Sequence, residues 1–489
     1  MRREEFEFEK GRFTLRPLLI LFATLAFALV SCEKDPEPEP EPDPDPGISA
    51  EVLMLNNWIW DEMGLYYLWE NYIPDIDPTK EPDPEEFFYK LLYEELDRDS
   101  WITDDYDALI ASFDGVELTT GMVARPWLVY SDADDVMYVV LYVTPDSPAE
   151  NAGVQRGDII IAVDGEFLTK TNYRDLFYQT TATFQFGEFV GEDLELNGKS
   201  AEITAIELNQ NPLVHSEIID YQGKKIGYFV YTQFTGGPND EWEDALDDMF
   251  IQFISENVEE VIVDLRYNGG GYGYLSAKMA SALVSAPAME NEEVFVKTLW
   301  NDGLYNYWLE YDLDGDGAAD GQESEQLVRK FPYNDLNMDL QRVYFLTTDW
   351  TASASEQVMI GLYPYMDVIQ VGTTTYGKCY GSYTLSDTDK HNWAMQPIIT
   401  KYANANGYTD FVNGIIPDYY VEEYSLVPLF GSFEDPLLAT ALEDMTGVAP
   451  EVTKSAEQRF DFEPLPVPRK RLPEMKIKLP GREELLEVY

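Results

Sequence analysis

The clearest catalytic potential of this chain lies in residues 347–362, which read TTDWTASASEQVMIGL. A cluster of small residues at 352–355 leaves an expected strand and enters an expected helix. A serine at such a junction lies at a helix N-terminus, where the dipole and free backbone N–H groups favour developing negative charge. Ser353 is therefore a candidate nucleophile. Ser355 is the alternative nucleophile, and a plain helix cap is the non-catalytic interpretation of Ser353.

A serine nucleophile needs a proton acceptor, and histidine is scarce in this chain. The sequence contains only His215 and His391, whereas Lys378 follows Ser353 by 25 residues in the stretch TYGKCYGS. A lysine can replace imidazole when it is buried enough to be neutral, because desolvation lowers the pKa of an amine. Ser353 and Lys378 thus form a candidate Ser–Lys pair, and a structural salt bridge is the other interpretation of Lys378. Cys379 is interpreted as a bystander.

A glycine-rich turn follows an expected buried strand at residues 261–271, which read VIVDLRYNGGG. Glycine lets a backbone approach a substrate closely. Together with SASE and the Gly-Lys element, this turn resembles the C-terminal processing (tail-specific) peptidase family. The resemblance covers roughly residues 57–442 and includes the late segments GIIPDYYVEE and DPLLATALE.

The resemblance implies a role for each matching residue. Ser353 would be the nucleophile and Lys378 the general base, and the oxyanion donors would be the N–H of Ala354 and that of Gly269 or Gly270. Family members often carry a glutamine four residues after the lysine, where this chain has Ser382. A hydroxyl can donate or accept a hydrogen bond, so Ser382 is expected to orient the lysine.

The activity that this resemblance implies is that of a serine endopeptidase, which hydrolyses peptide bonds without a cofactor. The departure at Ser382 keeps a second hypothesis open, namely a catalytically inactive ligand- or peptide-binding protein on the same fold. An assay for cleavage products separates the two hypotheses.

Residues 145–168 read PDSPAENAGVQRGDIIIAVDGEFL and resemble a PDZ domain. The resemblance implies a groove that takes an extended peptide by strand addition, often through its C-terminal carboxylate. Gly121, Met122 and Val123 are expected where the carboxylate-binding loop would lie. The alternative is a PDZ fold retained only as a spacer or lid.

A second candidate site is the stretch YDLDGDGAADGQE, which fits the calcium loop of an EF-hand. Its expected ligands carry hard carboxylate oxygens: Asp312, Asp314, Asp316, Asp320 and Glu323. Clear flanking helices are not evident in the sequence. Two interpretations therefore stay open, a loop that binds a structural calcium ion and an Asp/Gly-rich hairpin turn without metal.

The N-terminus has the pattern of an export signal, with basic residues ahead of an apolar run at residues 18–30. The run ends in Leu-Val-Ser-Cys and resembles a bacterial lipobox, which implies acylation of Cys32. An ordinary signal peptide is the alternative. Residues 33–46 alternate proline and acid and predict an extended tether. We therefore expect a cell-envelope lipoprotein in the outer membrane, with surface exposure left open.

The formal net charge of -58 over 489 residues limits the partners of this chain. Phosphate binding needs lysine and arginine, so nucleic acid is excluded as a partner. An anionic membrane surface would also repel the chain, so any membrane attachment needs a covalent or apolar anchor, and acylated Cys32 is the expected contact with the lipid bilayer. The expected partners are protein or peptide substrates.

Hydrophobic periodicity predicts three folded parts. They are an N-terminal helical segment, a PDZ-like β-rich domain, and an α/β protease core with mainly parallel strands, inferred from alternating strands and helices between residues 224 and 371. The expected divisions are signal peptide 1–32, acidic tether 33–50, helical segment 51–113, PDZ-like domain 114–210, protease core 211–450 and proline-rich extension 451–489.

Overall fold

The computed structural model describes residues 47–113, 116–130, 134–312, 317–409, 411–451, 462–467, 479–481 and 484–485. The described residues from Ile48 onward form one compact unit. None of the helices in these ranges combines the length and apolarity that a membrane crossing requires.

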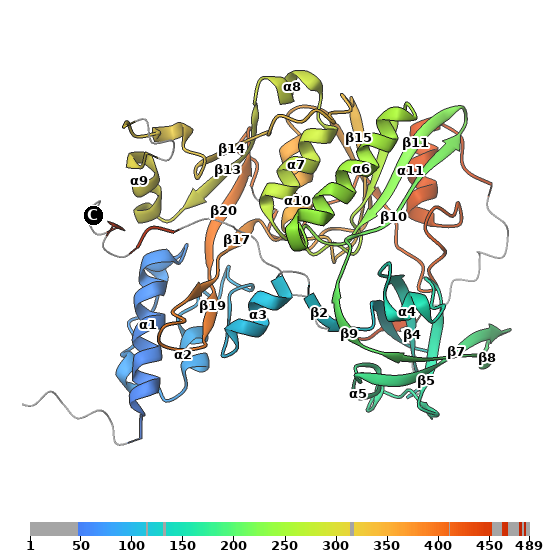
Figure 1. The fold of residues 1–489 in the computed structure, drawn as a ribbon, viewed down its shortest axis with the longest axis horizontal. Coiled ribbons are helices and arrows are strands. Elements are labelled where there is room, and N and C mark those ends of the chain that lie inside the picture. Colours follow the sequence, from blue (N-terminus) through green and yellow to red (C-terminus); the bar gives the residue numbers. More distant parts are fainter. Residues whose placement is uncertain are drawn as a thin grey trace, which may run out of the picture. The chain divides into compact units, whose positions relative to one another are not determined.

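A six-stranded sheet of order β10-β11-β12-β15-β16-β21 forms the centre of the α/β core (Figure 1). Its strands are β10 Leu213–Tyr221, β11 Lys224–Tyr231, β12 Glu260–Asp264, β15 Arg342–Thr347, β16 Asp367–Gly372 and β21 Tyr419–Tyr420. The edge strand β10 pairs antiparallel with β11, and the other four pairings are parallel. The inner strands are buried over most of their length, as expected for a parallel sheet covered on both faces.

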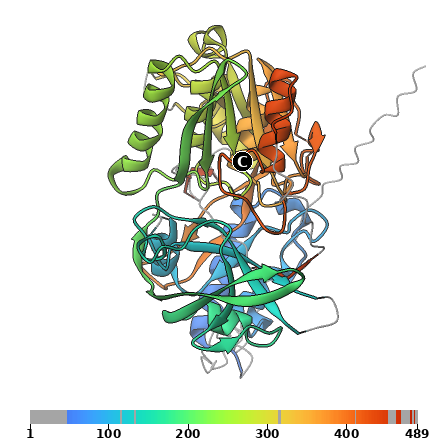
Figure 2. The ribbon, with the colours of Figure 1, turned by 90° about the vertical axis from the view of Figure 1, so that its right-hand side faces the viewer.

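Helices cover both faces of this sheet, and Figure 2 shows α6 and α11 on opposite sides of the strands. Helices α6 Glu241–Ser255, α7 Gly273–Leu283 and α10 Ala354–Leu362 share one apolar cluster with Val261 and Val263. Helix α11 Pro436–Thr446 packs instead with Ile262. Alternate residues of β12 therefore supply the two cores, as the period of two in a strand requires.

The expectation of mainly parallel strands is not confirmed, because most strand pairings are antiparallel. A four-stranded sheet of order β14-β13-β20-β17 is antiparallel throughout. Its strands are β13 Val294–Trp300, β14 Val328–Lys330, β17 Tyr380–Ser382 and β20 Ile398–Asn404. A small antiparallel sheet joins β1 Trp101–Thr103, β19 Ala394–Gln396 and β18 Leu385–Ser386. Among the described residues no helix lies between β17 and β20 or between β18 and β19, and parallel pairing would require a longer crossover connection.

The PDZ-type part is built on a further antiparallel sheet, of order β22-β3-β4-β5-β7-β8, with β6 pairing β5. Its strands are β3 Met122–Leu128, β4 Val136–Val143, β5 Ile159–Val163, β6 Glu166–Phe167, β7 Thr181–Val190, β8 Asp193–Thr204 and β22 Glu463–Pro464. Two short helices accompany it, α4 Pro148–Asn151 and α5 Tyr173–Phe177. Ser147 caps α4, as the Ser-Pro pair predicts, because its hydroxyl accepts the N–H of Glu150 at 3.2 Å.

The N-terminal helices α1 Ala50–Tyr66, α2 Pro84–Lys90 and α3 Tyr106–Phe113 precede this sheet. The sequence pattern after Pro82 and Pro84 predicts a helix from Glu85 to Leu96, but helix α2 ends at Lys90. Helices α1 and α2 share an aromatic-rich core with α9 Asp302–Glu310, which lies far along the chain. The helical segment is thus built into the rest of the described body.

Candidate active site

Ser353 lies in the connection from β15 to α10, at the N-cap position of the helix. Its φ angle is +56°, in the left-handed region that non-glycine residues rarely adopt. The connection is fixed from behind, because the Thr351 hydroxyl donates to the carbonyl of Leu265 at 2.8 Å. Ser353 is 6% exposed. A serine on a sharp, strained strand-to-helix turn is the arrangement that presents a nucleophile.

The glycine turn after β12 packs directly against this serine. Asn268 holds the two segments together, because its carbonyl accepts the N–H of Ala352 at 3.0 Å and the hydroxyl of Ser355 at 3.1 Å. Gly270 has φ +108°, and a methyl group there would lie 2.7 Å from the Cβ of Ser353. Only glycine fits this contact without strain. The hydroxyl of Ser355 is occupied by this turn, which favours Ser353 over Ser355 as nucleophile.

The three candidate oxyanion donors differ in their surroundings. The N–H of Gly270 donates to the side-chain oxygen of Asn268 at 2.8 Å, so it is engaged. Ala354 is the first residue of α10, where a backbone N–H has no intrahelical acceptor. Within the described ranges the N–H of Gly269 has no hydrogen-bond acceptor. Ala354 and Gly269 are therefore the better pair of donors.

A buried carboxylate, that of Glu356, links the serine turn to the segment that carries the lysine. Glu356 accepts the N–H of Ser353 at 2.9 Å, of Gly377 at 2.7 Å and of Lys378 at 2.8 Å. It also accepts the hydroxyl of Thr375. Burial raises the pKa of Glu356 to about 7, although these four hydrogen bonds oppose the shift. Sequence reasoning missed this residue, although an acid inside the otherwise uncharged stretch of α10 was visible.

Lys378 is half-buried in the connection between β16 and β17. Arg98 holds this connection from outside, with one terminal nitrogen that donates to the carbonyls of Tyr376 at 2.8 Å and Gly377 at 3.1 Å. Ser382 is buried in β17 and pairs with Ile398 in β20. The backbone N–H groups of Ser353 and Lys378 thus both donate to the carboxylate of Glu356. The orienting role of Ser382 stays a prediction.

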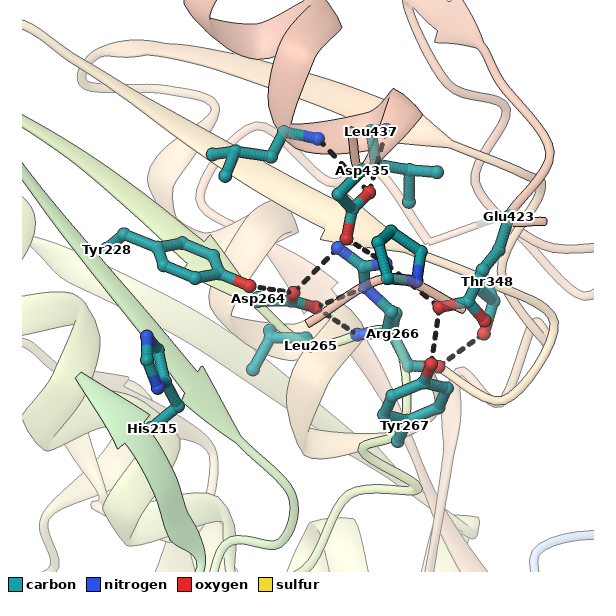
Figure 3. Close-up of polar contacts among 12 residues, drawn as sticks. His215, Tyr228, Asp264, Leu265, Arg266, Tyr267, Thr348, Glu423, Asp435 and Leu437 are labelled. Atoms are coloured by element: carbon teal, nitrogen blue, oxygen red, sulfur yellow. Dashed lines mark hydrogen bonds and ion pairs between the residues drawn. The ribbon is translucent and has the colours of Figure 1, made fainter. Parts of the chain in front are cut away.

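A buried ionic network lies behind the glycine turn (Figure 3). Arg266 contacts Asp264 at 2.8 Å, Asp435 at 2.8 Å and Glu423 at 2.9 Å. Arg156, in the turn before β5 of the PDZ-type part, contacts the same Glu423 at 2.8 Å. Burial opposes ionisation of Glu423, but the two guanidinium groups hold its pKa below the usual value.

The network also touches the segment of the glycine turn directly. Arg156 donates to the hydroxyl of Tyr267 at 2.7 Å, and Tyr267 precedes Asn268 in the turn. The PDZ-type sheet and the glycine turn are thus joined through buried polar contacts. Sequence reasoning did not single out Arg156, Glu423 or Asp435.

Three family models match parts of this chain. Residues 225–421 match the model of peptidase family S41, residues 54–101 its N-terminal domain, and residues 139–181 a PDZ domain. The chain carries a peptidase family S41 domain. The S41 match spans the strand-to-helix turn of Ser353, the glycine turn and Lys378.

Curated relatives and a solved structure resemble the same parts. A carboxyl-terminal-processing protease of Picosynechococcus sp. is 29% identical over 145 residues, 28% of this chain and 32% of that protein. A carboxy-terminal processing protease of Bacillus subtilis is 24% identical over 169 residues, 34% of this chain and 32% of that protein. The matches thus span about a third of the length of these relatives.

A crystal structure from Bacteroides fragilis, of a protein assigned to the S41 proteases, resembles this chain over a longer range. It is 27% identical, with a TM-score of 0.67, and the similarity covers 80% of this chain and 98% of that one. The fold of most of this chain is therefore similar to the fold of that protein.

A large hollow of about 1490 Å³ lies beside the S41 domain at the ends of its parallel strands. Thr348 and Thr373, which follow β15 and β16, line it together with Trp127 and Phe189 of the PDZ-type sheet. Open α/β sheets bind ligands at the carboxyl ends of their strands. The residues that line this hollow do not include Ser353 or Lys378, so it is a neighbouring space rather than the site itself.

The other predicted sites are placed only in part. Of the calcium loop, Asp314 and Asp316 and the side chain of Glu323 lie outside the described residues. The carboxylate of Asp312 accepts the N–H of Gly317 at 2.8 Å, and the N–H of Asp320 donates to a backbone carbonyl. The described residues contain no group of three or more potential ligands arranged to hold a metal ion. Calcium binding stays a prediction.

Two further predictions concern Cys32 and Cys379. Cys32 lies outside the described residues, so its acylation is untested. Cys379 is a buried free thiol next to Lys378, and burial raises its pKa to about 11. A thiol with this pKa is largely protonated near neutral pH, which agrees with a bystander.

Proposed function

We propose that this chain is a serine endopeptidase in which Ser353 is the nucleophile and Lys378 the general base. The observation that carries the proposal is the shared carboxylate of Glu356, which fixes the backbones of both residues beside the glycine turn. The match to peptidase family S41 supports the same reaction class.

The reaction follows from these groups. The neutral amine of Lys378 takes the hydroxyl proton of Ser353 as the serine oxygen attacks the scissile carbonyl carbon. The N–H groups of Ala354 and Gly269 stabilise the charge on the carbonyl oxygen. When the C–N bond breaks, Lys378 returns its proton to the leaving amine and an acyl-enzyme remains. Water, deprotonated by Lys378, then releases the acid and regenerates Ser353. No cofactor is needed for these steps.

The PDZ-type sheet is proposed to recognise peptide substrates by strand addition. Its contacts with Tyr267 and Glu423 through Arg156 give a physical route by which its position can affect the glycine turn. The peptide-binding role of Gly121, Met122 and Val123 is part of this proposal.

Attachment to the cell envelope through acylated Cys32 completes the proposal, with an outer-membrane location. A Cys32→Ala variant should leave the membrane fraction. Unchanged fractionation of this variant would show that the anchor is elsewhere.

Digestion of a peptide library, read by mass spectrometry, tests the activity. Wild-type protein should give products, and a Ser353→Ala variant with an unchanged circular dichroism spectrum should give none. If the folded wild type gives no products with any peptide, the catalytically inactive binding protein becomes the better interpretation.

A further inference from the structure

Strand β3 of the PDZ-type sheet is paired with a segment from the proline-rich extension. Strand β22 lies antiparallel to β3, with Glu463 opposite Leu128 and Pro464 opposite Trp127. The pairing continues for one residue, because the N–H of Leu465 donates to the carbonyl of Pro126 at 3.0 Å. Residues 462–467, which read FEPLPV, are called the tail strand below. The tail strand therefore occupies the edge at which an added peptide would pair.

Helix α5 contacts the tail strand from another side. A terminal nitrogen of Arg174 donates to the carbonyl of Pro466 at 3.0 Å. Leu465 packs against the apolar cluster that contains Tyr173 and Phe177 of this helix. A strand that pairs with β3 and packs against a helix of the same domain lies as a bound peptide would lie in a strand-addition groove.

Two apolar side chains anchor the tail strand. Phe462 is 8% exposed, and its ring stacks on Phe189 of β7 with the centroids 5.5 Å apart. Leu465 belongs to the other cluster of the PDZ-type sheet, so the two side chains lie on opposite faces of the sheet. Their odd spacing produces this arrangement, because successive side chains of a strand alternate between faces. The exposed Glu463 makes no comparable contact.

The backbone pairing is weaker than that of an ordinary strand. Pro464 and Pro126 each lack an N–H group, so the pair has fewer hydrogen bonds than its length would allow. A strand held by two side chains and few backbone bonds can be displaced by another peptide of similar chemistry.

The groove accommodates a segment that has no free carboxylate, since the chain continues beyond Val467 to Tyr489. The loop expected to bind a carboxylate is satisfied locally. The N–H of Gly121 donates to the hydroxyl of Thr119 at 3.0 Å, and that of Met122 to the hydroxyl of Thr120 at 3.4 Å. Both observations favour an internal peptide segment over a chain end.

We propose that the tail strand is an intramolecular ligand of the PDZ-type groove. The groove then selects internal, extended, proline-containing segments with apolar side chains three residues apart. A substrate must displace the tail strand to bind. Only this last consequence rests on the proposed peptidase function, and binding itself can be measured without hydrolysis.

The test uses the full chain with Ser353→Ala, so that hydrolysis cannot consume the probe. The probe is the fluorescent peptide FEPLPV, blocked at both ends, and its binding is followed by fluorescence anisotropy. A Leu465→Asp variant should bind the probe at least roughly tenfold more tightly than its parent, because a tethered ligand competes at an effective concentration in the millimolar range. The matched control Glu463→Gln should bind as the parent does.

Equal affinity of the parent and Leu465→Asp, with both proteins folded, would overturn the proposal. Should Leu465→Asp lower the melting temperature strongly, Leu465→Pro replaces it, because that change removes the N–H to Pro126 and keeps an apolar side chain. Tighter probe binding without any cleavage by the Ser353 enzyme would refute the peptidase and leave the self-occupied groove intact.

Discussion

The backbone N–H groups of Ser353 and Lys378 donate to the same oxygen of Glu356, at 2.9 and 2.8 Å. These two hydrogen bonds hold the backbones of the two residues close together, although 25 positions separate them in the sequence. Because Glu356 belongs to the helix that Ser353 caps, a movement of the helix N-terminus also moves the segment of Lys378. One side chain thus positions both members of the proposed pair.

Replacing each of the two serines in the SASE segment should show which one is the nucleophile and which one has a structural role. Ser353→Ala should lower kcat/KM at least about a thousandfold with little change in melting temperature. Ser355→Ala should keep most of the activity but lower stability by about 1 to 3 kcal/mol, because its buried hydroxyl bonds to Asn268. The measurements are kcat/KM and urea unfolding. The opposite pattern of activities would assign the nucleophile to Ser355.

Glu356→Gln should reduce activity. The carboxylate of Glu356 has two acceptor oxygens, which together accept four hydrogen bonds, whereas a glutamine amide has only one acceptor oxygen. It should also change how stability depends on pH. The folded protein binds this proton more tightly than the unfolded chain, since burial raises the pKa of Glu356 from 4.5 to about 7. The corresponding stability is present below pH 4.5 and is lost as the pH rises through about 7.

The melting temperature of the wild type minus that of Glu356→Gln should therefore decrease as the pH rises from about 5 to 8. The exposed Glu259→Gln serves as the control and should show no such difference. A constant difference between wild type and Glu356→Gln across this range would show that Glu356 keeps one protonation state.

Gly270→Ala should reduce kcat/KM by more than its effect on folding would explain. The added methyl group would lie 2.7 Å from the Cβ of Ser353 and 3.1 Å from the backbone nitrogen of Ala354. Gly223→Ala is the matched control, since Gly223 also has a positive φ of +80° but its Cβ would meet nothing within 4 Å. If both variants lose the same fraction of activity at equal stability, contact with the serine turn is not what Gly270 provides.

Lys378→Arg should be inactive, because a guanidinium group does not deprotonate in proteins. His215→Ala and His391→Ala should remain active, so that no histidine accounts for the pH dependence. The measurement is kcat/KM against pH for the wild type and the three variants, and it should rise with pH in every active enzyme. An inactive histidine variant together with an active Lys378→Arg would contradict the Ser–Lys mechanism.

Sequence patterns predicted the parts of the fold that rest on local rules. From the sequence alone, the apolar runs at 136–143 and 159–163 are predicted to be strands. The structure has strands at Val136–Val143 and Ile159–Val163, because these runs end at turn residues. The prediction of mainly parallel strands was not confirmed. It overlooked antiparallel strands such as Tyr380–Ser382 and Ala394–Gln396, which are too short to give a periodic hydrophobic pattern. Arg98, Arg156 and Glu356 were missed, because each is defined by partners distant in the sequence.

The far end of the proline-rich extension returns to the first helix of the chain. The hydroxyl of Tyr66 donates to the carbonyl of Pro480 at 2.7 Å across 414 residues of sequence, and Leu485 is 1% exposed in the same aromatic-rich core. During synthesis α1 emerges early, but this part of its apolar surface stays uncovered until residues 480–485 follow. The helical core can therefore close only after residues 480–485 have been synthesised, more than 400 positions after α1.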